Sequence, residues 1–81
     1  MKYDFSNDAI KAIGKMDANT AGRIIKGIIG LPGKGDTKPM EGYPDDSMRL
    51  RVGGYRVIYR LIEDGRTIHI QDIGSRGDIY K

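Results

Sequence analysis

Arginines at alternating strand positions are the feature of this sequence best suited to chemistry on phosphate. Residues 49–81 carry seven Lys or Arg against four carboxylates, whereas residues 1–48 carry seven of each. Every basic residue of the second segment except the last is arginine, and the planar guanidinium fork fits a phosphate better than a lysine ammonium does. The charge distribution therefore predicts an anionic partner for the C-terminal half, either a nucleic acid or an acidic protein.

Two turns position these arginines on a predicted three-stranded meander over residues 47–76. Gly53-Gly54 separates the first strand from the second, and Asp64-Gly65 separates the second from the third. Both dipeptides are typical of two-residue type I′ hairpin turns, which fix the register of the strands they join. One face is then apolar and is predicted to line the core: Met48, Leu50, Val52, Tyr55, Val57, Tyr59, Leu61, Ile68 and Ile70.

The opposite face of the meander gathers four arginines and the only histidine: Arg49, Arg51, Arg56, Arg60 and His69. The register places Arg51 opposite Arg56, and like charges in this position mildly destabilise a sheet. Folding alone does not explain that pair, whereas binding of a polyanion would. A solvated or protein-binding surface is the alternative interpretation of the arginines, and a half-exposed sheet residue is the alternative for His69.

The N-terminal residues predict a short strand followed by a helix. Tyr3 and Phe5 alternate with charged residues, which is typical of a strand at the edge of a sheet. Ser6 is a plausible N-cap, and Asp8 follows in the first turn, where a negative charge favours the helix dipole. The first helix should end near Lys15.

A second helix is predicted by apolar residues at helical spacing, namely Ala21, Ile24, Ile25, Ile28 and Ile29. Gly30 and the following Pro32 should end it. Residues 32–46 contain all three prolines and no periodicity, so we expect a loop. The isoleucine stripe would meet the apolar face of the meander.

These elements predict a single small α+β domain over residues 1–81. Two N-terminal helices should pack on one face of a small antiparallel sheet, made of the short N-terminal strand and the three-stranded meander. The chain has no cysteine and one histidine, so we expect neither a disulfide nor a metal site. It has no apolar run of the ~18 residues needed to span a membrane and no signal-peptide pattern, so we expect a cytoplasmic protein.

The whole chain resembles the RelE/ParE superfamily, the toxins of bacterial type II toxin–antitoxin systems. The resemblance lies in the two short helices, GDTKPMEG from Gly35 to Gly42, RLRVGGYRVIYRL, and the closing IGSR and IY. RelE-like members cut messenger RNA in the ribosomal A site, whereas ParE-like members share the fold and bind DNA gyrase. The closing arginine and tyrosine are more similar to the RelE-like branch.

The resemblance also implies roles for individual residues. Arg56 would bind phosphate, Arg76 would contact the scissile phosphate and assist the leaving group, and Tyr80 would stack on or orient the cut nucleotide. Ser47 and Arg49 stand where better-studied members have two lysines. Arginine can stabilise charge, but with a pKa above ~12 it is a poor general base.

Metal-free RNA cleavage requires attack of a ribose 2′-hydroxyl on the adjacent phosphorus. A base must take the hydroxyl proton, cations must stabilise the phosphoryl charge, and an acid must protonate the leaving 5′-oxygen. The cations would be Arg49, Arg51, Arg56 and Arg76. The proton carrier stays open among His69, Tyr80, Asp78 and Lys81, and the ribosome could supply the group instead.

We therefore predict a ribosome-dependent mRNA endonuclease that needs no cofactor and inhibits translation. The predicted catalytic residues are Arg49, Arg56, Arg76 and Tyr80. The predicted RNA contacts are Arg51, Arg60, His69 and Lys81. A RelB-like, acidic antitoxin would neutralise the basic face and form an oligomer with the toxin. A ParE-like gyrase-binding toxin, or a weak enzyme acting only as an antitoxin-binding module, are the alternatives.

Overall fold

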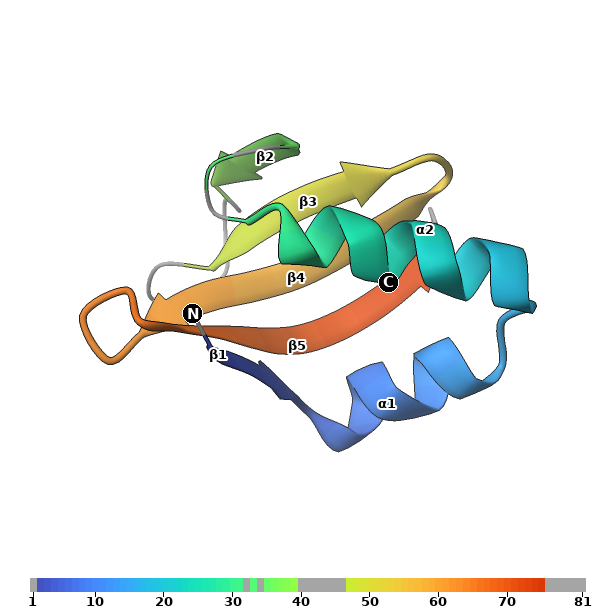
Figure 1. The fold of residues 1–81 in the computed structure, drawn as a ribbon, viewed down its shortest axis with the longest axis horizontal. Helices are drawn as coiled ribbons and strands as arrows, with labels where there is room; N and C mark the ends of the chain where they lie inside the picture. Colours follow the sequence, from blue (N-terminus) through green and yellow to red (C-terminus); the bar gives the residue numbers. More distant parts are fainter. Residues whose placement is uncertain (1, 32, 34, 40–46, 76–81) are drawn as a thin grey trace.

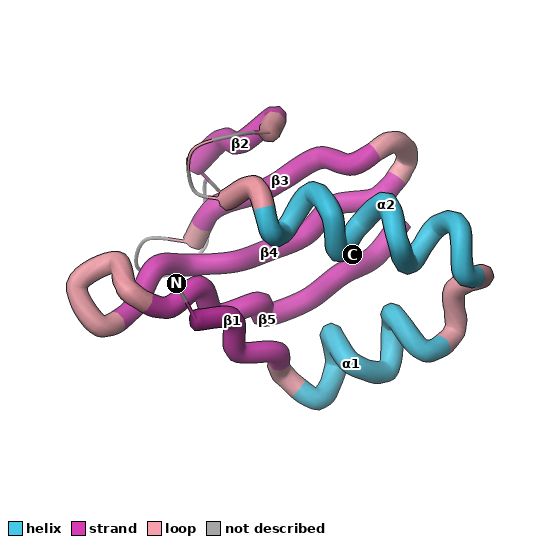
Figure 2. The backbone as a smooth tube through the Cα atoms, viewed as in Figure 1, coloured by secondary structure: helices cyan, strands magenta, loops and turns pink. Residues whose placement is uncertain are grey.

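The fold is a five-stranded mixed sheet with both helices on one face (Figures 1 and 2). The computed structural model describes residues 2–31, 33, 35–39 and 47–75. Along the chain the elements are β1 (Lys2–Phe5), α1 (Asn7–Gly14), α2 (Ala18–Ile29), β2 (Asp36–Pro39), β3 (Met48–Val52), β4 (Tyr55–Ile62) and β5 (Thr67–Ser75). The strands lie in the order β1-β5-β4-β3-β2. The predicted two-layer α+β architecture is confirmed.

The sheet differs from the prediction in two ways. β1 pairs with β5 in parallel rather than antiparallel, and an additional strand, β2, forms inside the predicted loop and pairs antiparallel with β3. Gly35 leads into β2 at a φ of 107°, a conformation that glycine adopts without strain. Pro39 is tolerated because β2 is an edge strand. Proline content therefore indicated a loop where the chain forms a short edge strand.

The predicted register of the meander is confirmed. Leu50 lies opposite Val57 and Arg51 opposite Arg56 in the first hairpin, and Leu61 lies opposite Ile68 in the second. The first turn departs from type I′ because Gly53 has a φ of 59° whereas Gly54 is not among the residues with positive φ. Positive φ at the first central residue alone is the type II′ pattern. The second turn is centred on Glu63-Asp64, with φ of 54° and 57°, rather than on the predicted Asp64-Gly65 pair, and four residues separate β4 from β5.

A β-bulge in β5 was not predicted. Tyr59 pairs with Ile70 and Ile58 pairs with Asp72, so Gln71 is an extra residue. The bulge reverses the alternation, and Ile73 is therefore 3% exposed in the core while Asp72 stays exposed. Without the bulge the Asp72 carboxylate would point toward the helices.

Helix α1 is tied to this bulge through its N-cap. The Ser6 hydroxyl accepts a hydrogen bond from the backbone N–H of Ala9 at 3.1 Å and donates one to the carbonyl of Gln71 at 2.6 Å. The predicted cap is therefore confirmed. It satisfies a helical N–H and a carbonyl at the irregular part of β5 together, and Ala9 is fully buried beneath it.

Helix α2 covers β3 with a narrower stripe than predicted. Ile24 and Ile28 are each 1% exposed, whereas Ile25 and Ile29 are 38% and 62% exposed. Adjacent residues of a helix point about 100° apart, so one member of each pair faces the sheet. Gly27 permits the close approach, since a Cβ there would lie 2.9 Å from Cγ2 of Val52.

The core lies between these helices and the inner face of the sheet. It contains Ala9, Ile24, Ile28, Leu31, Leu50, Val57, Tyr59, Ile68, Ile70 and Ile73. Leu61, which the alternation assigned to the core, is 40% exposed near the far end of β4. Within the described ranges, neither helix is long and apolar enough to cross a membrane.

Candidate phosphate-binding site

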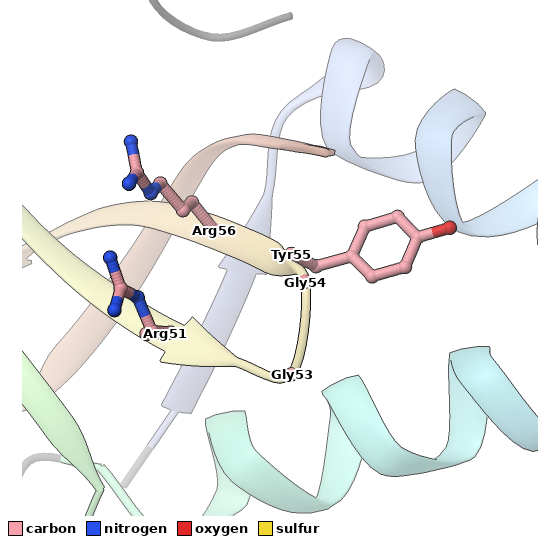
Figure 3. A pocket seen from close by; sticks show the side chains of 5 residues that line it. All are labelled: Arg51, Gly53, Gly54, Tyr55 and Arg56. Carbon is pink, nitrogen blue, oxygen red and sulfur yellow. The ribbon is translucent and has the colours of Figure 1, made fainter. Parts of the chain in front are cut away.

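Arg51 and Arg56 lie side by side on the face of the sheet that the helices leave uncovered (Figure 3). They come from β3 and β4, and their guanidinium groups point the same way. Tyr55 points in a different direction and packs against the core. The predicted separation of a basic face from an apolar face is therefore confirmed at this end of the hairpin.

The two arginines border a hollow of about 130 Å³ whose other lining residues are Gly53, Gly54 and Tyr55. On β5 the residue opposite Arg56 is Gly74, so no side chain rises beside that arginine from the neighbouring strand. Among the described residues, the glycine turn and Gly74 therefore place no side chain on two sides of the guanidinium groups. A phosphate oxygen could approach them there.

Arg51 is exposed, and no described carboxylate forms an ion pair with it. Its neighbour on β2 is Asp36, but the Asp36 carboxylate lies 3.8 Å from NH2 of Arg49 instead. Two guanidinium groups on paired residues repel each other weakly. An anion placed between them would relieve this repulsion and bind to both, by the bidentate geometry that arginine favours.

Arg49 differs from the expectation of an open basic surface. Its side chain is 10% exposed, and its NH1 atom is buried with no hydrogen-bond partner among the described residues. Ser47 and Ile58, on the same side of the sheet, are 4% and 2% exposed. The alternation of side chains along β3 predicts correctly which face Arg49 occupies. It does not predict how exposed Arg49 is, because exposure depends on which other segments cover that face.

Arg60 and His69 are paired across β4 and β5 as predicted, but they lie far along the strands from Arg56. Four residues of strand span about 13 Å, so Arg60 and Arg56 start from well-separated positions on β4. Nδ1 of His69 lies 2.7 Å from a carboxylate oxygen of Asp4 on β1. The basic residues therefore share one face of the sheet but are spread along the length of its strands.

The remaining predicted site residues, Arg76, Tyr80 and Lys81, lie outside the described residues. The sequence interpretation also missed Lys38 on β2, which lies directly opposite Arg49. The signal was present, because Asp36 and Lys38 alternate with Thr37 in DTKP, but the neighbouring prolines favoured a loop. Lys38 is exposed and shares the outer face with the arginines.

Proton transfer by Tyr59, the buried tyrosine of β4, is disfavoured. Burial raises the pKa of Tyr59 above its ordinary value, an effect partly opposed by a hydrogen bond from Thr37. Tyr59 also belongs to the core and cannot reach the outer face. Among the described residues, no group of three or more His, Cys, Asp or Glu could hold a metal ion.

Comparisons with known proteins agree with this geometry. A family model described as the ParE toxin of type II toxin–antitoxin systems matches residues 3–80. A structure of the RelB–RelE complex from Methanococcus jannaschii is 26% identical, with a TM-score of 0.77 over 95% of this chain and 94% of that one. An archaeal RelE–RelB complex from Pyrococcus horikoshii is 25% identical, with a TM-score of 0.74 over 95% and 96%.

A third solved structure has lower sequence identity and is similar to this chain in fold only. The YoeB/ParE toxin from Agrobacterium tumefaciens is 18% identical, with a TM-score of 0.77 over 93% of this chain and 98% of that one. A comparison with curated proteins gives no match.

Proposed function

Because the chain belongs to the ParE toxin family of type II toxin–antitoxin systems, within the RelE/ParE superfamily, we propose that its toxic activity is cleavage of messenger RNA on the ribosome. The observation that carries the proposal is the pair formed by Arg51 and Arg56 beside an open hollow on the uncovered face. Two relatives at 25% and 26% identity are RelE proteins.

In the proposed reaction the ribose 2′-oxygen forms a bond to the adjacent phosphorus while the bond from phosphorus to the 5′-oxygen breaks. The products are a 2′,3′-cyclic phosphate and a 5′-hydroxyl. Arg51 and Arg56 hold the non-bridging oxygens, where negative charge grows in the transition state. Arg76 assists the leaving oxygen, and Tyr80 orients the nucleotide. Arg49, mostly buried, lies two residues before Arg51 on β3 and adds to the positive potential of this face.

Proton transfer from the 2′-hydroxyl needs a partner that the described arginines do not supply, because arginine stays protonated. His69 is held by Asp4 and stands far along β5 from Arg56. We therefore assign Arg60 and His69 to flanking phosphates, with Lys81 as a further contact. The proton acceptor comes from the C-terminal residues or from the ribosome.

The basic face that would bind RNA is also a suitable binding surface for an acidic antitoxin. The solved relatives from Methanococcus jannaschii and Pyrococcus horikoshii are complexes with RelB. We propose that a RelB-like partner binds this chain in an oligomeric complex and places carboxylates against the basic face. Charge complementarity of this kind speeds association and excludes the RNA phosphate from the same cations.

Brief expression followed by mapping of RNA 5′ ends tests the enzymatic proposal. Wild-type protein should produce cuts inside codons of translated messages. Arg56→Ala and Arg76→Ala should each lower the cleavage rate by ~10²–10³, as loss of one preorganised electrostatic donor does elsewhere. Arg66→Ala is the matched control, because Arg66 is exposed in the turn between β4 and β5 and should cut at the wild-type rate.

Full-rate cleavage in both site variants would remove the proposed site. The family description itself names ParE, which favours gyrase binding as the second candidate. Expression would then inhibit gyrase and induce DNA damage without new RNA 5′ ends. Those two readouts separate the candidates in one experiment.

A further inference from the structure

We propose that Lys38 of β2 and Arg49 of β3 form a second phosphate subsite, one nucleotide along the RNA from the Arg51–Arg56 pair. The protein would then hold two consecutive phosphates of a single strand. This inference rests on the proposed function and extends it to the edge strand, which no part of the toxin assignment covers. It also identifies Lys38 as a substrate contact.

The strand register creates two parallel rows of cations on the outer face. Lys38 lies opposite Arg49, and Arg51 lies opposite Arg56. Arg49 and Arg51 are two residues apart on β3, so the rows are separated by about 7 Å. This spacing is similar to that between neighbouring phosphorus atoms of an extended RNA strand, so each row could receive one phosphate.

Lys38 faces outward because its neighbour faces inward. Thr37 lies opposite Leu50, which is 1% exposed in the core, and its side chain hydrogen-bonds to buried Tyr59. Side chains alternate along a strand, so Lys38 must point to the other face. It is exposed there, and the contact between Arg49 and Asp36 confirms that these positions of β2 and β3 share that face.

Arg49 supplies independent evidence that a negative charge is missing from this row. Its side chain is nine-tenths buried, and within the described part of the chain NH1 has no hydrogen-bond partner. The carboxylate of Asp36 lies 3.8 Å from NH2, well beyond the ~2.7–2.9 Å of a charge-assisted hydrogen bond. A buried cation left partly unneutralised is costly. A phosphate held by Lys38 above Arg49 would supply the missing charge.

Asp36 has a defined part in this arrangement. Its carboxylate is 62% exposed and lies between the two rows, opposite Arg51 and near Arg49. In the free protein it weakly occupies the position that a phosphate oxygen would take. RNA binding would have to displace it, so its removal should strengthen binding.

The test compares ligands with one and two phosphates on the full-length protein. A 2′-O-methyl dinucleotide carries one internal phosphate and a 2′-O-methyl trinucleotide carries two, and neither can be cleaved. Lys38→Gln should weaken trinucleotide binding about threefold or more and change dinucleotide binding less than twofold. The slope of log affinity against log salt for the trinucleotide should fall by about 0.7, the value for one phosphate contact on a single strand.

Lys26→Gln is the matched control, because Lys26 is exposed on α2, on the opposite side of the sheet, and the charge change is identical. Asp36→Asn should tighten trinucleotide binding, and this second variant keeps the test independent of Lys38. Thermal unfolding of each variant checks that the fold is intact. A glutamate-rich peptide is titrated in parallel as a model of an acidic protein.

The outcomes separate this subsite from the function it rests on. If Lys38→Gln behaves like Lys26→Gln on both RNAs while Arg56→Ala loses binding, the subsite is wrong and the proposed function stands. If wild-type protein binds neither RNA, the subsite is wrong, and if Arg56→Ala also cleaves at the full rate, the proposed function fails with it. Loss of peptide binding without loss of RNA binding in Lys38→Gln makes the row a protein contact and overturns the inference.

Discussion

Replacing Arg51 by glutamine should make the protein more stable and less active. Arg51 lies directly opposite Arg56, and no described carboxylate forms an ion pair with it. For two unit charges about 7 Å apart in a water-like dielectric, the repulsion is about 0.6 kcal/mol, within the range measured for cross-strand pairs. In a domain of this size that energy raises the melting temperature by about 2–5 °C.

The same substitution removes one of the two guanidinium groups that face the proposed phosphate. We therefore expect cleavage to fall by ~10²–10³ while stability rises. Calorimetry at low salt measures the gain in melting temperature, and the RNA 5′-end assay measures the loss of activity. At about 1 M salt the Debye length falls to ~3 Å and the stability gain should vanish.

Arg66→Gln is the control for the general effect of removing one positive charge from a chain of net charge +3. A double-mutant cycle with Arg56→Gln isolates the pair, because Arg51→Gln should stabilise only while Arg56 is present. Equal melting temperatures for Arg51→Gln and Arg66→Gln, or a gain that persists in the Arg56→Gln background, would refute the reasoning.

Two further predictions concern the support of the site. Gly35→Ala should destabilise the fold by about 1–3 kcal/mol, because φ is 107° and a Cβ would lie 2.7 Å from Cδ1 of Leu50. Chemical denaturation measures the loss, and an unchanged denaturation midpoint would contradict the predicted backbone strain. Trinucleotide binding should also weaken if β2 shifts and moves Lys38. Burial raises the pKa of Tyr59 above 10.0, so the unfolded chain loses the phenol proton first and stability falls as pH rises from about 10. Tyr59→Phe should remove that part of the alkaline loss, and identical slopes of melting temperature against pH in the two proteins would contradict it.

The local sequence was sufficient for the hairpins and for the side of the sheet that each arginine occupies. Gly53-Gly54 set the first turn, and strict alternation then places Leu50 inward and Arg51 outward. The second turn lies one residue earlier than the predicted Asp64-Gly65 pair but keeps the predicted register. The cap at Ser6 was also predictable, because capping is a contact between near neighbours in the chain. Each of these features depends on residues only a few positions apart.

Tertiary structure decided the pairing of β2 with β3, the parallel pairing of β1 with β5, and the bulge at Gln71. It also decided that Arg49 is buried and that Lys38 stands opposite it. No short-range pattern encodes these features, since each depends on segments distant in sequence. Which edge a strand joins, and which side chains are then covered, is set by the packing of the whole core against the sheet.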